Sequence, residues 1–184
     1  MVELPPTPPY TLSADEKAVQ VMVYTASGLI WGDVVVKVLI RVSTWLKTNA
    51  APDRVCLYNA RAMTTMGGAG RPLHFREMHV ALPQVLAFHM MPPAKDPVDY
   101  DVTEPNRKML PVSVVVSSFR LDGCLRMAAQ SSLAKFLEVT REAYLPVYDV
   151  KITNPNNPTF GTIQVPYAIV RQEQCLFTLT DAPA

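Results

Sequence analysis

The chain has 184 residues, of which 49% are hydrophobic and 18% charged, and 17 basic against 16 acidic residues leave a net charge of +1. This balance excludes the broadly basic surface of a general nucleic-acid binder. No stretch reaches the roughly 18 uncharged apolar residues of a membrane-spanning helix, because Asp33, Lys37 and Arg41 interrupt the most apolar window. High apolar content with little net charge favours association with a partner chain or with further copies.

The N-terminus and the cysteines indicate a cytoplasmic protein. The opening "MVELPPTPPYTLSADEK" has neither the basic start nor the apolar segment of a secretion signal. The three cysteines are far apart and odd in number, which fits buried, reduced thiols better than a disulfide framework or a zinc site. They are Cys56, Cys124 and Cys175.

Residues 1–16 predict a proline-rich arm. Such a segment is already restricted in conformation, so docking it on a neighbouring chain loses less entropy than ordering a flexible tail. The predicted interaction residues are Pro5, Pro6, Pro8, Pro9 and Tyr10 of the arm, together with Lys37 and Arg41.

Residues 17–91 predict a first small domain that opens with two strands. "AVQVMVYT" alternates between apolar and other residues with a period of two, which is typical of a strand. A turn at Ser27-Gly28 leads to a second strand that contains Gly32. A glycine inside a strand commonly marks a bulge or a bend, and small barrels need such bends to close.

A short helix and three more strands complete this domain. Val42, Trp45 and Leu46 have the spacing of one apolar helix face. The strands follow as "VCLYNARAM", "LHFREMHVAL" and "VLAFHMM", so the predicted order is β-β-α-β-β-β.

Residues 92–110 predict a linker, and residues 111–181 a second domain that repeats the first. With Gly32 over Gly123, an offset of 91, the halves align without a gap from 21–46 to 112–137. The offset is 90 thereafter, which pairs Leu86 with Leu176. The agreement in order and spacing predicts a tandem duplication. The predicted structural core residues are Gly32, Trp45, Leu46 and their partners Gly123, Phe136 and Leu137.

The stretches "VMVYTASGLIWGDVVV", "VCLYNARA" and "MHVALPQVLAF" resemble the Sm-like, SH3-type small β-barrel. The resemblance implies a mainly β fold with short helices, made of two tandem homologous barrels. It departs from the Sm pattern in the place of the helix and in lacking clear equivalents of the RNA-contacting Asp and Asn. "RVSTWL" also resembles the Arg-Leu-Ser-Asp-x-Leu-Asn phrase of small uncharacterised bacterial domains, at Arg41, Ser43 and Leu46.

The sequence predicts no catalytic, cofactor-binding or metal-binding residues. The loop "TMGGAGRP" lacks the Gly-Lys-Ser/Thr ending of a phosphate-binding loop. His74 and His79 are five apart, so a regular strand points them to opposite faces. Together with His89 they are expected to be isolated surface or half-buried side chains. The acidic residues of the linker lack the glycine and glutamate of a calcium-binding loop.

These patterns predict a structural or assembly subunit without enzymatic activity. It would bind protein partners or self-associate through barrel edges and the N-terminal arm. The alternative is an Sm-like nucleic-acid-binding protein, for which Lys37, Arg41 and nearby arginines give a modest basic bias. An enzyme with an interdomain site, or a membrane-surface protein with a basic helix from Val34 onward, is the remaining hypothesis.

Overall fold

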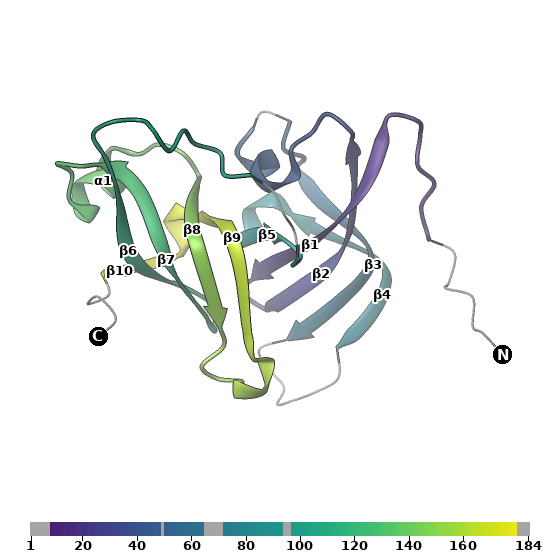
Figure 1. The fold of residues 1–184 in the computed structure, drawn as a ribbon. Coiled ribbons are helices and arrows are strands. Elements are labelled where there is room, and N and C mark those ends of the chain that lie inside the picture. Colours follow the sequence, from purple (N-terminus) through teal and green to yellow (C-terminus); the bar gives the residue numbers. More distant parts are fainter. Residues whose placement is uncertain (1–7, 49, 65–71, 94–96, 180–184) are drawn as a thin grey trace.

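A computed structural model describes residues 8–48, 50–64, 72–93 and 97–179. The fold is mainly β with short helices, as the sequence predicts, and the ten strands of these described ranges form one antiparallel sheet (Figure 1). No helix in these described ranges has both the length and the apolar character needed to cross a bilayer.

The first half of the chain follows the order expected from the sequence. Its elements are β1 (Glu16–Thr25), β2 (Gly28–Lys37), η1 (Val42–Lys47), β3 (Arg54–Thr64), β4 (Leu73–Ala81), η2 (Leu82–Gln84) and β5 (Ala87–Met90). The expected helix is the 3-10 helix η1, and the tight link before β5 is a second 3-10 turn.

The second half repeats this order. Its elements are β6 (Arg107–Val116), β7 (Phe119–Ala128), α1 (Leu133–Val139), β8 (Tyr144–Thr153), η3 (Pro158–Phe160), β9 (Thr162–Arg171), η4 (Gln172–Gln174) and β10 (Leu176–Leu179). Helix α1 begins after Ser132, whose side chain accepts a hydrogen bond from the Lys135 backbone N–H. β6 begins inside the segment predicted as linker.

The strand order in the sheet is β10-β6-β7-β8-β9-β5-β1-β2-β3-β4. Each half therefore has the order fifth-first-second-third-fourth, which is the arrangement that the duplication hypothesis requires. The two halves share one sheet, because β5 pairs with β9 at Ala87 opposite Val170 and Phe88 opposite Ile169. The finer expectation of two separate Sm-like barrels stays a prediction.

Both second strands bend at the predicted glycine. The register of β2 on β3 shifts between Trp31 and Asp33, and that of β7 on β8 between Asp122 and Cys124. A Cβ on Gly32 would lie 2.7 Å from the Tyr58 carbonyl oxygen. At Gly123 the corresponding distance, to the Tyr148 carbonyl oxygen, is 2.6 Å. These close approaches admit glycine alone without a shift of the neighbouring strand.

The strand opposite each glycine has a matching distortion. Asn59 in β3 has φ of 48° and Asp149 in β8 has φ of 52°, both in the left-handed region. These two residues are 90 apart, as the alignment of the halves requires. Asn and Asp adopt this conformation more readily than most residues, which explains their presence there.

The fifth strands align one residue away from the sequence-based pairing. Val21 lies opposite Met90, and its equivalent Val112 lies opposite Leu179. β10 is thus offset from β5 by 89, so Phe88 matches Phe177. The pairing of Leu86 with Leu176 was wrong because the second half has one residue fewer before its last strand.

Two buried clusters lie across the boundary between the halves. The cluster around β2 and β3 includes Tyr144 and Ile169 from the second half. The other cluster, centred on β6 to β8, includes Met22, Tyr24 and Leu29 from the first half. Each half therefore contributes side chains to the hydrophobic core of the other half.

The two predicted aromatic anchors differ in burial. Trp45 is 9% exposed, and its indole N–H donates a 2.8 Å hydrogen bond to the Ala50 carbonyl. Phe136 packs against the core of the second half but is only half-buried. Leu46 is buried, whereas Leu137 is half-buried like Phe136. Core anchoring by the helix is stronger in the first half.

Candidate functional site

The sheet has two terminal strands, β10 and β4, which have no further strand beside them among the described residues. On β10, Leu176 is 69% exposed and Leu179 is 63% exposed. On β4, Leu73 and Phe75 are exposed, but Arg76, Glu77 and His79 are exposed as well. One terminal edge is thus mainly apolar and the other is mixed and charged.

β10 and β4 are the fifth strand of one half and the fourth strand of the other, and the junction between the halves also pairs a fifth strand with a fourth. β5 is the fifth strand of its half and β9 is the fourth strand of the other half. Backbone hydrogen bonds extend the junction beyond the ladder, because Arg171 N–H donates to the Leu86 carbonyl at 2.7 Å. The Tyr144 hydroxyl donates to the carbonyls of Leu82 and Val85 at 3.0 and 3.1 Å. The chain thus contains one complete fourth-to-fifth strand interface.

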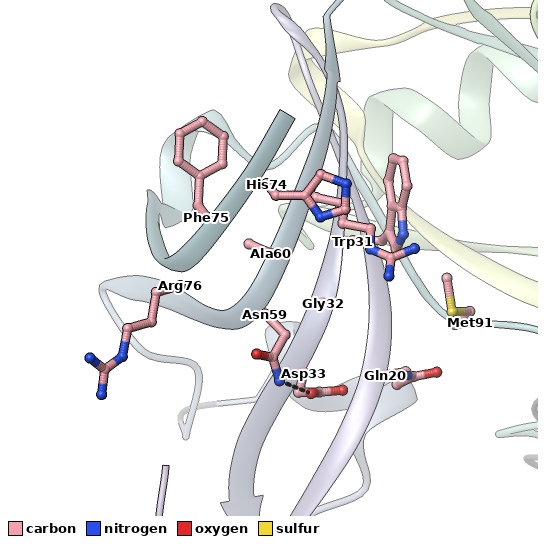
Figure 2. Close-up of a pocket in the computed structure, with 11 residues that line it drawn as sticks. Gln20, Trp31, Gly32, Asp33, Asn59, Ala60, His74, Phe75, Arg76 and Met91 are labelled. Atoms are coloured by element: carbon pink, nitrogen blue, oxygen red, sulfur yellow. Dashed lines mark hydrogen bonds between the residues drawn. The ribbon is translucent and has the colours of Figure 1, made fainter. Parts of the chain in front are cut away.

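A hollow of about 670 Å³ lies on the first half where β2, β3 and β4 meet, and Figure 2 shows its lining. Arg61, His74 and Arg76 contribute basic or titratable side chains, and Trp31 and Phe75 contribute aromatic ones. We call these five residues the basic hollow. Their neighbour Asp33 accepts a 3.1 Å hydrogen bond from the Asn59 side-chain amide, which holds the carboxylate at the lower end of the view.

The described part of the arm lies against its own chain. The Tyr10 ring packs 5.1 Å from the Tyr58 ring, measured between centroids, and the Tyr10 hydroxyl donates to Asp33 at 3.4 Å. Partial burial and the nearby Asp33 carboxylate raise the Tyr10 pKa. Pro8 is exposed and Pro9 is half-buried, while Pro5 and Pro6 lie outside the described residues.

The two predicted basic interaction residues have partners within the chain. Lys37 ends β2 and forms ion pairs with Asp15 at 3.0 Å and Glu16 at 3.3 Å. Arg41 donates to the Tyr167 hydroxyl at 3.1 Å and to the carbonyl of Pro97. Arg41 therefore connects the first half to the linker and to β9. The stretch from Val34 to Lys37 is strand, so a basic helix does not begin at Val34.

His89 is not a surface or half-buried histidine, since its side chain is 2% exposed. Nδ1 lies 2.8 Å from the Met90 carbonyl oxygen, and Nε2 lies 3.0 Å from the Tyr24 hydroxyl. Because a carbonyl only accepts, Nδ1 carries the proton and Nε2 accepts from Tyr24. Burial lowers the His89 pKa to about 4, so the ring is neutral at physiological pH.

The linker acids have structural partners. The Tyr148 hydroxyl donates to Asp99 at 2.6 Å, and Arg126 forms an ion pair with Glu104 at 2.7 Å. Asp101 accepts from the backbone N–H and the hydroxyl of Thr103. Asp99 also lies 3.8 Å from Lys47 of the first half, so the linker acids contact both halves as well as the linker itself.

The structure brings together three donor side chains that sequence spacing did not connect. Cys56, Glu77 and His79 place one ligand atom each within 4.8 Å of the others. Cys56 and Cys124 are half-buried, and Cys175 is buried. The pairing of β3 with β4 places Cys56 directly opposite His79. No local motif in the sequence indicates which residues of these two strands lie opposite each other.

Comparison with protein-family models, curated proteins and solved structures gives no match for this chain.

Proposed function

We propose that the protein is a non-enzymatic assembly subunit that associates with further copies of itself through its free sheet edges. The observation that carries this proposal is the β5–β9 junction, in which a fifth strand pairs with a fourth strand of the other half. Among the described residues, the two strands at the ends of the sheet are of the same two types, β10 as a fifth strand and β4 as a fourth. Pairing β10 of one copy with β4 of the next would continue the sheet. We also propose that a duplication produced the two halves.

The physical driving force is the pairing of backbone groups together with burial of apolar surface. An edge strand has unpaired N–H and C=O groups that another strand can satisfy. The exposed side chains of Leu176 and Leu179 would add apolar contact, each worth up to about 2 kcal/mol when fully buried. Such an interface is heterologous, so repeated copies would form a ring or an open filament.

The charges on β4 make this pairing selective. If β10 docks on β4 as β5 docks on β9, then Phe177 lies opposite His79 and Leu176 opposite Val80. His79 Nε2 already lies 2.7 Å from Glu77 Oε1, and this contact offsets part of the cost of covering these groups. Charged residues on an edge strand discourage pairing with arbitrary strands. A partner must therefore match the positions of Glu77 and His79.

The N-terminal arm would add contacts to a neighbouring copy. Tyr10 packs on Tyr58 of β3 and donates to Asp33 of β2, which attaches the described part of the arm to the first half. Pro5 and Pro6 are the part of the arm proposed to contact a neighbouring copy.

Sedimentation velocity of the full-length protein over a hundredfold concentration range tests the proposal. We expect a weight-average sedimentation coefficient that rises with concentration. The double variant Leu176→Lys with Leu179→Lys should remain monomeric, because lysine on β10 replaces the apolar contact with charge. The control is Leu39→Lys, which alters a 96% exposed leucine between β2 and η1, outside both terminal strands, and should associate like the parent. A parent protein that is monomeric throughout, or a control that behaves like the β10 variant, would contradict the proposal.

A second candidate function is binding of single-stranded nucleic acid, and the basic hollow favours it. Arg61 and Arg76 are exposed and could contact phosphates, while Trp31 and Phe75 offer faces on which bases can stack. This combination of basic and aromatic side chains is the usual requirement of a single-strand platform.

Fluorescence anisotropy with a labelled oligouridine distinguishes this second function. We expect binding that weakens with salt, and the double variant Arg61→Ala with Arg76→Ala should lower the slope of log affinity against log salt by about one for each lost phosphate contact. The control is Arg120→Ala, an exposed arginine of the second half that is paired with Asp122. Absence of binding at low salt would exclude this function.

A further inference from the structure

The donor cluster of Cys56, Glu77 and His79 lies on two directly paired strands. Cys56 of β3 is opposite His79 of β4, and Glu77 is two residues before His79 on the same side of β4. The Cys56 thiol donates to Glu77 Oε1 at 3.4 Å, and His79 Nε2 lies 2.7 Å from the same oxygen. One carboxylate oxygen thus lies between a sulfur and a ring nitrogen.

The chemistry of these three donors selects among metal ions. A thiolate and an imidazole are preferred ligands of Zn²⁺, with distances near 2.3 Å to sulfur and 2.0 Å to nitrogen, and carboxylate oxygen is accepted as well. Ca²⁺ and Mg²⁺ require oxygen ligands almost exclusively, so this set does not suit them. Paired strands also hold the Cα atoms of the donors at fixed separations, which reduces the ordering that binding would require.

We propose that Cys56, Glu77 and His79 form a Zn²⁺ site with three protein ligands and a water molecule in the fourth position. Glu77 Oε1 would move aside from its present contacts, so that sulfur, nitrogen and oxygen surround the ion. The ion would connect β3 to the edge strand β4. The site uses Glu77 and His79, which also lie on the edge proposed for self-association, but metal binding by the single chain can be measured without that association.

Zn²⁺ binding requires the Cys56 thiol as thiolate and the His79 ring in its neutral form. Partial burial raises the Cys56 pKa, the Tyr58 hydroxyl opposes this effect, and the Glu77 carboxylate raises the pKa further. The groups facing the sulfur are thus Glu77, His79 and Tyr58. Zn²⁺ must displace the thiol proton, so binding releases a proton and strengthens as pH rises.

The second half provides an internal comparison. Its ladder places Pro146 opposite Ile169 and Tyr148 opposite Tyr167. Pro146, Tyr167 and Ile169 stand where the first half has Cys56, Glu77 and His79, and neither Pro nor Ile offers a metal ligand. One ion per chain is therefore expected.

Titration of the chelator-treated, full-length protein with Co²⁺ and then Zn²⁺ tests the site. Co²⁺ replaces Zn²⁺ in such sites and gives a thiolate charge-transfer absorption, which reports a bond to sulfur. We expect this absorption to saturate at one equivalent and to disappear on addition of Zn²⁺. Cys56→Ser should abolish it, and His79→Gln should weaken Zn²⁺ binding by roughly tenfold or more, which corresponds to at least one lost ligand.

Matched controls separate the site from other metal-binding groups. Cys124→Ser removes the other half-buried cysteine, and His74→Gln removes the other exposed histidine of β4. Both controls should bind Co²⁺ like the parent. His79→Gln changes an exposed side chain, so this variant tests the site even if Cys56→Ser fails to fold.

Three outcomes would overturn the proposal. They are the absence of a thiolate absorption in the parent, binding of several ions without saturation, and full binding by the His79→Gln variant. Conversely, Zn²⁺ should raise the melting temperature of the parent and leave that of His79→Gln unchanged, because an ion bound only to the folded state stabilises it.

Discussion

β4 and β9 occupy the same position in their halves, and their burial differs over most of their length. From Tyr167 to Val170, β9 is buried, since β5 pairs with it. In the corresponding part of β4, Glu77 and His79 are exposed and charged or titratable. Tyr167 and Ile169 thus occur in β9, which is paired with β5, whereas the corresponding Glu77 and His79 occur in β4, which has no such strand beside it among the described residues.

Two halves with the same strand order can therefore have fourth strands with different surface chemistry. Where β5 covers β9, the paired residues Phe88 and Ile169 are both fully buried. On β4, polar side chains occupy the same register and form the donor cluster. The covered edge therefore has a packing role, and the uncovered edge is where ligand and partner binding are proposed.

Truncation of the two helix aromatics should give the largest contrast between the halves. We expect Trp45→Ala to lower the free energy of unfolding by about 3 to 5 kcal/mol, the usual cost of removing a buried aromatic side chain. Phe136→Ala should cost about 2 kcal/mol, because the ring is only half-buried. Urea denaturation of both variants measures the difference. Equal losses would show that the two anchors contribute alike despite their different exposure.

Substitution of the two bend glycines should instead show the halves to be alike. A Cβ at Gly32 or Gly123 would meet a backbone carbonyl oxygen at 2.7 or 2.6 Å, so each alanine variant should lose about 2 kcal/mol through overpacking. Gly161→Ala is the control, since its φ is 74° but no atom lies within 4 Å of the added carbon. Its expected loss of about 1 to 3 kcal/mol comes from the backbone alone, because φ of 74° with ψ of −154° is a conformation essentially restricted to glycine. A loss at only one bend would disprove their equivalence.

Acid destabilisation should originate in the first half, because Thr178 stands where the first half has His89. The folded-state pKa of His89 is about 4, below the unfolded value of about 6.5. Its contribution is fully present above the unfolded pKa and is lost as pH falls towards the folded pKa. Between about pH 7.5 and pH 5.5 the expected loss is about 1.4 kcal/mol.

Denaturation of His89→Gln and of the parent at both pH values measures this contribution. The variant should lose the His89-dependent part of the pH response, whereas His74→Gln, which changes an exposed histidine, should keep it. An identical response in all three proteins would assign the acid sensitivity to other groups.

The sequence was sufficient for the local features of the fold. Alternation of apolar residues predicted the first strands, and Gly32 and Gly123 predicted their bends, because these signals depend on neighbouring residues. The sequence also predicted a buried Trp45. Each of these features is decided within one or two strands.

Features that depend on contacts between residues far apart in the sequence could not be predicted in the same way. The burial of His89 results from packing against Tyr24, 65 residues earlier, and the donor cluster results from the register of β3 on β4. The offset of β10 was missed because a single deletion in a short segment leaves hydrophobic matches at either register. The basic hollow likewise combines residues from β2, β3 and β4.

The exchange of core side chains between the halves has a consequence for how the molecule unfolds. Tyr144 and Ile169 belong to the cluster of the first half, while Met22, Tyr24 and Leu29 belong to that of the second. Loss of either half would thus expose apolar surface on the other, which couples the two into one cooperative unit. Cleavage of the backbone at an exposed linker residue such as Val102 would leave two fragments that hold each other in the native state.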